Sequence, residues 1–515
     1  MNRRDFLLSG GLATLGAALP RAFRGSARQQ ADGRPNVLMI VMDSLSAENC
    51  SLYGYPRDTT PHLNRFAERS TVYHRHYAGG NFTAPGTATL LTGSYPWSHR
   101  AVNVLGTVLP EYEQRNLFHL FKQADYHNIA LSHTPLATVL LSQFADDIQQ
   151  LQRLENLALF QDTLLTRALP LDKYKVAFPS EMQYLAGTID AIDSRVQPGS
   201  LFLSNLHRVW RTGGRKFARD PNWDEYPRGV PQAGNSTMFL LEDSFDWWNA
   251  ELPKIQQPFM AYYHCYAPHF PYTPHVDFFE HFTGGWEPSG KPISRFGREN
   301  VWGSGNTISD LNFWRIDYDR YLASADLLIG QMLDHLEAQG ILDNTIVVIT
   351  ADHGELFERG ILGHTTPALY DPVARIPLMI YLPGQMQRQD INVPTSATDI
   401  LPTLLALTGQ SVPSWAQGEV LAPFNASPSA DRPVFTVEAK NTNRNGKLSR
   451  RSVSVVQDRY KLVHYAGYEE ADDVRELYDM EADSAELNNL IDRHPDIAAQ
   501  LIAAIDERLH DAAAI

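Results

Sequence analysis

The chain has 515 residues, of which 43% are hydrophobic and 20% are charged, so it can bury a large core without disulfide cross-links. Its formal net charge of −15, from 59 acidic and 44 basic residues without a long single-sign run, argues against a nucleic-acid partner. An anionic substrate therefore needs a local cation, and a bound divalent metal ion can supply one.

The N-terminal residues have the pattern of an export signal. The twin arginine Arg3-Arg4 precedes an apolar stretch rich in Gly and Ala, which is shorter than the roughly 20 residues of a membrane-spanning helix. We predict a twin-arginine signal peptide over residues 1–27, cleaved after Ala27, and a polar linker over residues 28–35. The protein is then exported to the periplasm or the extracellular space, or is retained at the membrane if uncleaved. No later segment is predicted to be a transmembrane domain.

Three continuous apolar runs predict buried strands of a parallel sheet, at residues 36–42, 259–263 and 345–350. Helical patterns separate these runs. Between residues 321 and 339, for example, apolar residues recur every three or four positions until a glycine ends the helix. This alternation predicts a doubly wound, mostly parallel α/β sheet within a large domain of residues 36–425.

The C-terminal residues 426–515 have a different character. Short β-rich runs at 433–437 and 451–456 alternate with turn-rich segments, and a helix begins near Asp496. This pattern predicts a small antiparallel C-terminal subdomain. The segment 136–250 mixes helical patterns with loops rich in Gly, Pro and Asn, and we expect it to lie on the active-site side.

The two cysteines, Cys50 and Cys265, do not have the spacing of a metal-binding pair. We expect both to be small buried hydrophobic residues. Their separation in sequence leaves open whether they pair.

Polar side chains directly follow two of the predicted strands. Asp43 follows the first strand, and Asp352 and His353 follow the strand at 345–350. A single aspartate in such a place is commonly a cap or a turn residue. Ligands of open α/β sheets, however, bind outside the carboxyl ends of the strands. The combination therefore predicts three metal-capable side chains at one edge of the sheet.

Residues 81–93 predict a loop that enters a short helix, with Pro85 in the first turn and Gly93 at the end. Thr83 is then at or next to the N-cap. One interpretation is that Thr83 only caps the helix. The other is that its hydroxyl attacks a phosphate or sulfate, because a helix N-terminus favours anions and a coordinated metal would lower the pKa of the hydroxyl.

Several longer segments, spread over most of the chain, can be compared with a known family. They include NVLMIVMDSL, LLTGSYP, AYYHCYAPHFPY, NTIVVITADHGELF and GHTTPALYDPVARIPLMIYLPG. In sequence and order they are similar to segments of the sulfatase family of the alkaline phosphatase superfamily. The resemblance implies an alkaline-phosphatase-like fold and a metal site built from Asp43, Asp352, His353 and the nucleophile at Thr83. It also implies that two histidines face the substrate and hydrogen-bond its ester oxygens or protonate the leaving group, namely His269 and His364.

The chain departs from the sulfatase pattern in several places. Sulfatases carry a Cys or Ser in C/S-x-P-S-R that is oxidised to formylglycine, whereas this chain has Thr83-Ala84-Pro85-Gly86-Thr87, and threonine gives no such aldehyde. The motif's arginine is thus replaced by Thr87, and the paired aspartates after the first strand become Asp43-Ser44. The later G-K-x-H segment becomes Ser132-His133-Thr134-Pro135, in which His133 is a further catalytic candidate. Because the arginine of the first motif and the lysine of the G-K-x-H segment are both absent, a free sulfate would lose two charge-assisted hydrogen-bond partners.

These departures resemble the threonine-nucleophile relatives of sulfatases, which include phosphoethanolamine and glycerophosphate transferases, phosphodiesterases and phosphonate hydrolases. One divalent metal (Mn, Zn, Mg or Ca) is implied, with the imidazole disfavouring the hard ions and Ser44 disfavouring a second metal. We predict hydrolysis of a phosphodiester or phosphonate through Thr83, in a small-molecule, glycan or lipid-headgroup ester. Arylsulfatase-like hydrolysis of a sulfate ester, phospho-group transfer and a non-catalytic binding protein are the alternatives. The sequence does not indicate the oligomeric state.

Overall fold

The computed structural model describes residues 33–152, 157, 222, 224–233, 237–296, 306–425, 431–440, 442, 445–469 and 471–513. The described residues from Arg34 onward belong to one compact unit. The predicted signal peptide of residues 1–27 lies outside the described residues, as do most of the linker 28–35 and much of the segment 136–250.

The central sheet has eight strands in the order β13-β2-β12-β9-β1-β8-β4-β5. The strands from β9 to β5 are parallel, whereas β12 is antiparallel to both of its neighbours and β13 is parallel to β2. In chain order the bounds are β1 Asn36–Met42, β2 Thr71–Tyr73, β4 His127–Ser132, β5 Gln150–Gln152, β8 Phe259–Cys265, β9 Thr345–Ala351, β12 Leu378–Tyr381 and β13 Gln389–Ile391. The predicted mostly parallel sheet is confirmed, and each of the three predicted strands is present.

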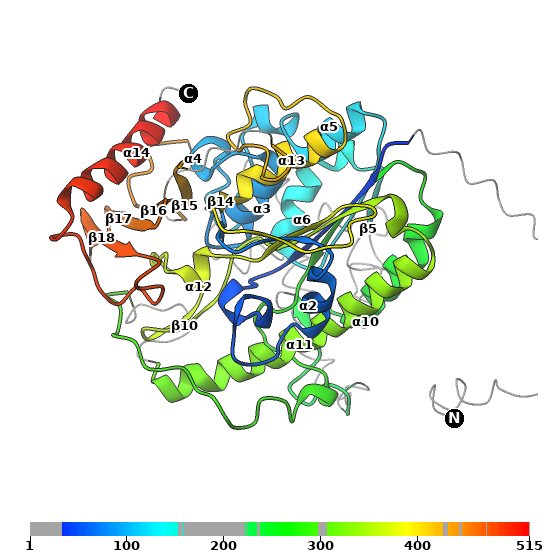
Figure 1. The fold of residues 1–515 in the computed structure, drawn as a ribbon, viewed down its shortest axis with the longest axis horizontal. Coiled ribbons are helices and arrows are strands. Elements are labelled where there is room, and N and C mark those ends of the chain that lie inside the picture. The colour runs from blue at the N-terminus through cyan, green and yellow to red at the C-terminus, as the bar shows by residue number, and fades with distance from the viewer. Residues whose placement is uncertain are drawn as a thin grey trace, which may run out of the picture. The chain divides into compact units, whose positions relative to one another are not determined.

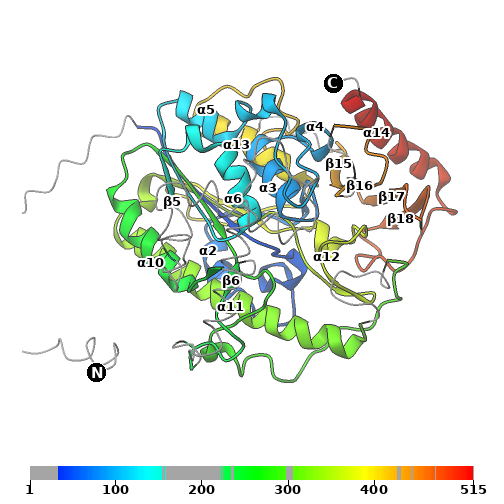
Figure 2. The ribbon, with the colours of Figure 1, turned by 180° about the vertical axis from the view of Figure 1, so that it is seen from behind.

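Helices cover both faces of this sheet (Figures 1 and 2). Alternate residues of β1 enter two separate cores, with Leu38 and Ile40 in one core and Val37 and Met39 in the other. The first core includes residues of α2 (Pro61–Ala67), α10 (Leu241–Glu251) and α11 (Ile308–Ala338). The second includes residues of α3 (Thr83–Thr92), α5 (Leu117–Gln123), α6 (Pro135–Gln143) and α13 (Ile400–Leu407). The chain is therefore doubly wound.

Helix α11 begins well before the predicted start at residue 321. Thr307 caps it in a capping box with Asp310, because each side chain accepts a hydrogen bond from the backbone N–H of the other residue. The first half of the helix buries polar residues that no apolar periodicity reveals, among them Asp319, which pairs with Arg57 at 2.7 Å. The predicted N-terminus of this helix was therefore wrong, and tertiary ion pairing is the reason.

A second, antiparallel sheet of four strands lies near the C-terminus (Figure 1). Its order is β15-β16-β17-β18, with bounds Val434–Glu438, Arg451–Gln457, Tyr460–Ala466 and Val474–Asp479. The terminal helix α14 (Pro495–Ala513) packs on this sheet through Leu501 and Ile505. The predicted small antiparallel unit is confirmed as part of the fold.

Shorter elements connect these parts. They are β3 (His76–Tyr77), α4 (Pro96–His99), β6 (Gln232–Ala233), β7 (Thr237–Met238), β10 (Leu356–Glu358), β11 (Ile361–Gly363), α12 (Asp371–Ala374) and β14 (Thr395–Ser396). Both cysteines are buried, as predicted, and the structure shows that they are free and do not pair. Among the described residues, no helix combines the length and apolarity needed to span a membrane.

Candidate active site

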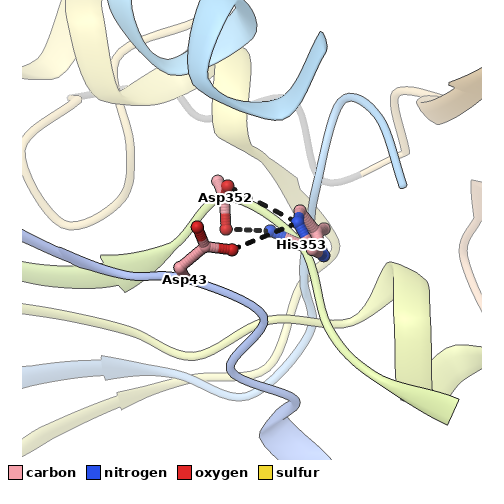
Figure 3. A group of neighbouring side chains, drawn as sticks. All are labelled: Asp43, Asp352 and His353. Atoms are coloured by element: carbon pink, nitrogen blue, oxygen red, sulfur yellow. Dashed lines mark hydrogen bonds and ion pairs between the residues drawn. The ribbon is translucent and has the colours of Figure 1, made fainter. Parts of the chain in front are cut away.

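Asp43, Asp352 and His353 lie together at the carboxyl edge of the central sheet, and we call them the aspartate–histidine cluster (Figure 3). Strands β1 and β9 are parallel and pair Met42 with Ala351, so the residues that follow them emerge side by side. Nε2 of His353 is 3.5 Å from Asp43 Oδ1 and 3.5 Å from Asp352 Oδ2, and all three side chains are fully buried. The structure thus brings together three of the four predicted metal ligands.

Ser44 orients both aspartates of the cluster. Its backbone has a left-handed φ of 64°, and its N–H donates to Asp352 Oδ1 at 3.2 Å. Its hydroxyl donates to Asp43 Oδ1 at 3.2 Å. Because the backbone N–H of His353 also donates to Asp352 Oδ1, at 2.9 Å, the other oxygen of this carboxylate is left for the cluster. The serine that replaces a family carboxylate therefore has a positioning role here.

The ring of His353 is fixed through its other nitrogen. Nδ1 donates to the carbonyl of Gly354 at 2.9 Å, so the neutral ring keeps its proton on Nδ1 and has its lone pair on Nε2. A Cβ on Gly354 would lie 2.1 Å from the carbonyl oxygen of Pro372, so only glycine fits in this close approach. Local sequence thus presents Nε2 of His353 to the two carboxylates.

The charges of the cluster are not balanced by hydrogen bonds. Asp43 Oδ2 and Asp352 Oδ2 are buried without a hydrogen-bond partner among the described residues. Burial and the charge of Asp43 raise the pKa of Asp352 to about 6. Burial alone would lower the pKa of His353, but the two carboxylates outweigh it and raise that pKa to about 9. Without a metal, this pKa keeps a second proton on Nε2 of His353, which offsets part of the carboxylate charge. A divalent cation can take the place of that proton, and two carboxylates and a neutral imidazole are suitable ligands for it.

Thr83 is the first residue of α3, and its Oγ1 is 3.5 Å from Nε2 of His353. The N-cap is Phe82, which makes no side-chain capping bond, so Thr83 does not act as the cap. The predicted helix with Pro85 in its first turn and Gly93 at its end is confirmed. A Cβ on Gly86 would lie 2.3 Å from the carbonyl oxygen of Asp352. This glycine lets the first turn of α3 pack directly against the cluster.

The two predicted substrate-facing histidines also lie beside the cluster. The rings of His364 and His353 are 4.2 Å apart, and those of His269 and His364 are 5.1 Å apart. The side chain of Asn81 holds the loop of His364 next to α3 by donating to the carbonyl of His364 at 2.9 Å. Burial lowers the pKa of both His269 and His364, and Asp43 partly opposes this.

Glu355 is a site residue that the sequence analysis missed. It is fully buried, and its Oε1 accepts a hydrogen bond from His364 Nδ1 at 2.9 Å while its Oε2 accepts one from Tyr272 at 3.1 Å. Burial raises its pKa to about 7. The bond fixes the ring of His364 and leaves Nε2 as the free nitrogen. The signal was available, since Glu355 directly follows the Asp352-His353-Gly354 run.

His264 is the second residue that was missed. It is the last residue but one of β8 and is fully buried, with Nε2 3.6 Å from Asp43 Oδ2 and 3.6 Å from Asp352 Oδ2. The predicted strand stopped at residue 263, so His264 was not recognised as a polar residue at the same sheet edge. Its position beside β1 was the signal that could have identified it.

His133, the remaining catalytic candidate, follows β4 and stacks on Phe239 with ring centroids 4.3 Å apart. Its backbone N–H donates to the carbonyl of His264 at 3.1 Å. Neither ring nitrogen has a hydrogen-bond partner among the described residues, and burial lowers its pKa to about 3. Its ring contacts are with Phe239 and Tyr263, so the catalytic role of His133 stays a prediction.

Comparison with known proteins identifies the family. The model of the sulfatase family matches residues 35–410, which include the cluster, Thr83, His269 and His364. This chain belongs to the sulfatase family. A second model, described as the C-terminal part of N-sulphoglucosamine sulphohydrolase, matches residues 365–514. The predicted placement in the alkaline phosphatase superfamily is confirmed, and the protein is a hydrolase acting on ester bonds.

Individual sulfatase-family relatives cover most of the chain. Choline-sulfatase of Rhizobium meliloti (strain 1021) is 25% identical over 506 residues, which are 92% of this chain and 86% of that protein. N-acetylgalactosamine-6-O-sulfatase of Bacteroides thetaiotaomicron is 21% identical over 528 residues, with 91% and 92% covered. The solved phosphonate monoester hydrolase from Silicibacter pomeroyi has a TM-score of 0.64 at 22% identity, with 93% and 95% covered. At this identity the structural likeness establishes the fold.

Proposed function

We propose that this sulfatase-family hydrolase cleaves a phosphodiester or phosphonate monoester with Thr83 as its nucleophile. A single divalent metal ion would be held by Asp43, Asp352 and His353, together with the threonine oxygen. The observation that carries the proposal is the 3.5 Å distance between Thr83 Oγ1 and His353 Nε2 at the start of α3. This places a hydroxyl at a helix N-terminus and beside two buried carboxylates.

When bound, the cation supplies positive charge and lowers the pKa of the Thr83 hydroxyl. Thr83 Oγ attacks phosphorus, so a threonine–phosphoryl bond forms and the bond to the leaving ester oxygen breaks. The N-terminus of α3 favours negative charge on the phosphoryl oxygens. A water molecule then attacks phosphorus, which releases the product and restores the hydroxyl.

His269 and His364 handle the protons in this proposal. Nδ1 of His364 donates to Glu355, and Nδ1 of His269 donates to the carbonyl of Phe270 at 2.5 Å. Each ring therefore has Nε2 free to take a proton from an attacking hydroxyl or water, and then to give it to the leaving oxygen.

The threonine supports a phosphate-type ester over a sulfate ester. Formylglycine cannot form at this position, and Thr87, which stands in place of the family arginine, is fully buried and uncharged. Within the described residues, Lys440 reaches the loop of His364 by donating to the carbonyl of Thr365 at 2.5 Å, and its charge contributes to lowering the pKa of His364. This lysine supplies one positive charge close to the position of an anionic substrate.

Sulfate-ester hydrolysis through unmodified Thr83 is the second candidate. The similarity to choline-sulfatase and to a glycan sulfatase supports it, since both of those proteins are named for sulfate esters. The two candidates share the nucleophile and the ligands and differ only in the ester.

Turnover of aryl phosphodiester, phosphonate, phosphomonoester and sulfate substrates tests the proposal, with and without added Mn or Zn. We expect metal-dependent turnover of a phosphodiester or phosphonate, a loss of roughly 1,000-fold or more in Thr83→Ala, and partial activity in Thr83→Ser. A quenched reaction should add one phosphoryl mass to the peptide that carries Thr83. Undiminished turnover in Thr83→Ala contradicts the proposal. Turnover of sulfate esters alone supports the second candidate. If no substrate is turned over and the protein contains no bound metal, a binding protein is supported instead.

We also propose that the protein is exported. The twin arginine Arg3-Arg4 and the apolar stretch after it support this location. The mass of the exported form shows whether cleavage follows Ala27, and a chain that stays in the cytoplasm would contradict the proposal.

A further inference from the structure

A further imidazole faces the two aspartates from the strand next to β1. Nε2 of His264 is 3.6 Å from Asp43 Oδ2 and 3.6 Å from Asp352 Oδ2. All three of these atoms are buried, and none has a hydrogen-bond partner among the described residues. Nε2 of His264 is therefore an unpaired buried atom at the same distance from an unpaired oxygen of each aspartate.

The spacing of these atoms suits a shared ion better than direct hydrogen bonds. An N–H···O hydrogen bond spans about 2.7–3.2 Å, so 3.6 Å is too long. Donor atoms that surround one ion with bonds of roughly 2.0–2.2 Å lie about 3.0–3.6 Å from each other. Nε2 of His353 is likewise 3.5 Å from Asp352 Oδ2. Asp352 Oδ2 is thus at coordination spacing from both histidines.

The ring of His264 is held through its other nitrogen. Nδ1 of His264 is 3.0 Å from the hydroxyl of Tyr262, which is also fully buried. The two residues are two positions apart on β8, so their side chains are on the same face of the strand. Metal-binding histidines are commonly oriented by such a partner on the nitrogen that does not bind the metal.

We propose that His264 is a ligand of the same metal ion as Asp43, Asp352 and His353. This inference rests on the proposed metal-dependent function and extends its ligand set. Two imidazoles and two carboxylates favour Zn or another transition metal over Mg and Ca, which prefer all-oxygen sites. The chain therefore selects its metal through a histidine that lies inside a core strand.

Binding of Zn and Mg to the mature protein tests the inference through readouts other than activity. His264→Phe fills the ring volume without a donor nitrogen, and His264→Asn offers an amide oxygen instead. The matched control is His76→Phe, because His76 is also fully buried with one unpaired ring nitrogen and bonds Thr395 instead of the aspartates. Each variant is measured by bound metal per chain and by the rise in Tm that metal causes relative to its own metal-free form.

We expect one Zn per chain in the wild type, with two imidazoles in its X-ray absorption spectrum. We expect affinity to be about 100-fold weaker in His264→Phe, unchanged in His76→Phe, and less selective for Zn over Mg in His264→Asn. A single imidazole in the wild-type spectrum overturns the inference, and so does unchanged Zn affinity in both His264 variants. The wild-type X-ray absorption spectrum tests the inference by itself, so the test does not depend on whether a variant folds. If His264 is not a ligand, the proposed function is still tested by the turnover assay with Thr83→Ala. If the wild type binds no metal, both the role of His264 and the metal dependence of the proposed function are contradicted.

Discussion

Two groups of buried carboxylates in this protein are neutralised in different ways. In the aspartate–histidine cluster, one oxygen of each aspartate has no hydrogen-bond partner among the described residues. In the second group, which we call the Lys461 cluster, Nζ of Lys461 on β17 is 2.8 Å from Asp371 on α12 and 2.8 Å from Glu486 after β18. The lysine is fully buried, and its charge faces two carboxylates from different parts of the chain.

The difference separates a structural role from a functional one. The Lys461 cluster contains its own cation and joins the four-stranded sheet to helix α12. The aspartate–histidine cluster gathers carboxylates without a lysine or arginine contact in the described part of the chain, which suits an exchangeable cation. Carboxylates that face imidazoles without a lysine or arginine therefore mark the site, whereas carboxylates paired with a lysine mark a structural joint.

The largest effect is expected from Asp352→Asn. This change removes one charge from the metal site, so we expect metal-dependent turnover to fall by roughly 1,000-fold or more. The metal-free protein should keep or raise its Tm, because burial and the charge of Asp43 already raise the pKa of Asp352 to about 6. Kinetics and thermal unfolding in chelator check both parts. A clearly lower metal-free Tm would mean that Asp352 is structural and would break the comparison.

The opposite result is expected from Lys461→Met. This change leaves Glu486 buried without its cation and leaves Asp371 with Arg375, 3.2 Å away, as its remaining cation. It should cost about 3–5 kcal/mol of unfolding free energy. Turnover per folded molecule should be unchanged. The control is Lys254→Met, because Lys254 is exposed and its pair with Glu251 should contribute at most about 1 kcal/mol. Denaturant unfolding measures both, and equal losses would contradict a special role for the buried lysine.

The pH dependence of the Lys461→Met variant sharpens this prediction. Burial raises the pKa of Glu486 to about 7 although Lys461 opposes the rise, so removal of the lysine should raise it further. A carboxyl whose folded pKa lies above its ordinary value of 4.5 destabilises the fold as pH rises from 4.5 through the folded pKa. The stability deficit of Lys461→Met should therefore shrink as pH falls from 8 to about 5.5. A deficit that grows over this range would show that Glu486 is not the group left unpaired.

The two clusters also differ in how far the sequence predicts them. Asp43, Asp352 and His353 directly follow apolar strands, so a rule about strand ends was enough to place them together. Lys461 and Asp371 have no such signal, because only the packing of β17 against α12 brings them into contact.

The site residues that were not predicted, His264 and Glu355, also owe their positions to packing between elements that are distant in sequence. His264 lies inside a strand whose other residues are apolar or aromatic, and its neighbours are set by the order of β8 and β1 in the sheet. Glu355 depends on the return of β11, which places His364 within 2.9 Å of it. Sequence patterns gave the strands and the residues at their ends, whereas contacts across strands required the folded topology.

Glu355 is a third kind of buried carboxylate in this protein. Its substitution is expected to have the smallest effect of those considered. Its partners are the neutral donors His364 and Tyr272 instead of a cation or a metal. Glu355→Gln keeps an oxygen that can accept the bond from His364 Nδ1, so the ring should stay oriented while the negative charge that favours a protonated ring is lost. We expect kcat to fall by roughly tenfold with little change in KM or in metal affinity.

Steady-state kinetics and a Zn titration of Glu355→Gln check this expectation. Tyr272→Phe is the matched control, because it removes the other hydrogen bond to Glu355 and leaves the contact with His364 in place. Its effect on kcat should be smaller than that of Glu355→Gln. Glu355→Gln could instead lower Zn affinity as much as Asp352→Asn does. That result would contradict the proposed role, because it would mean that the negative charge of Glu355 helps to hold the cation of the aspartate–histidine cluster.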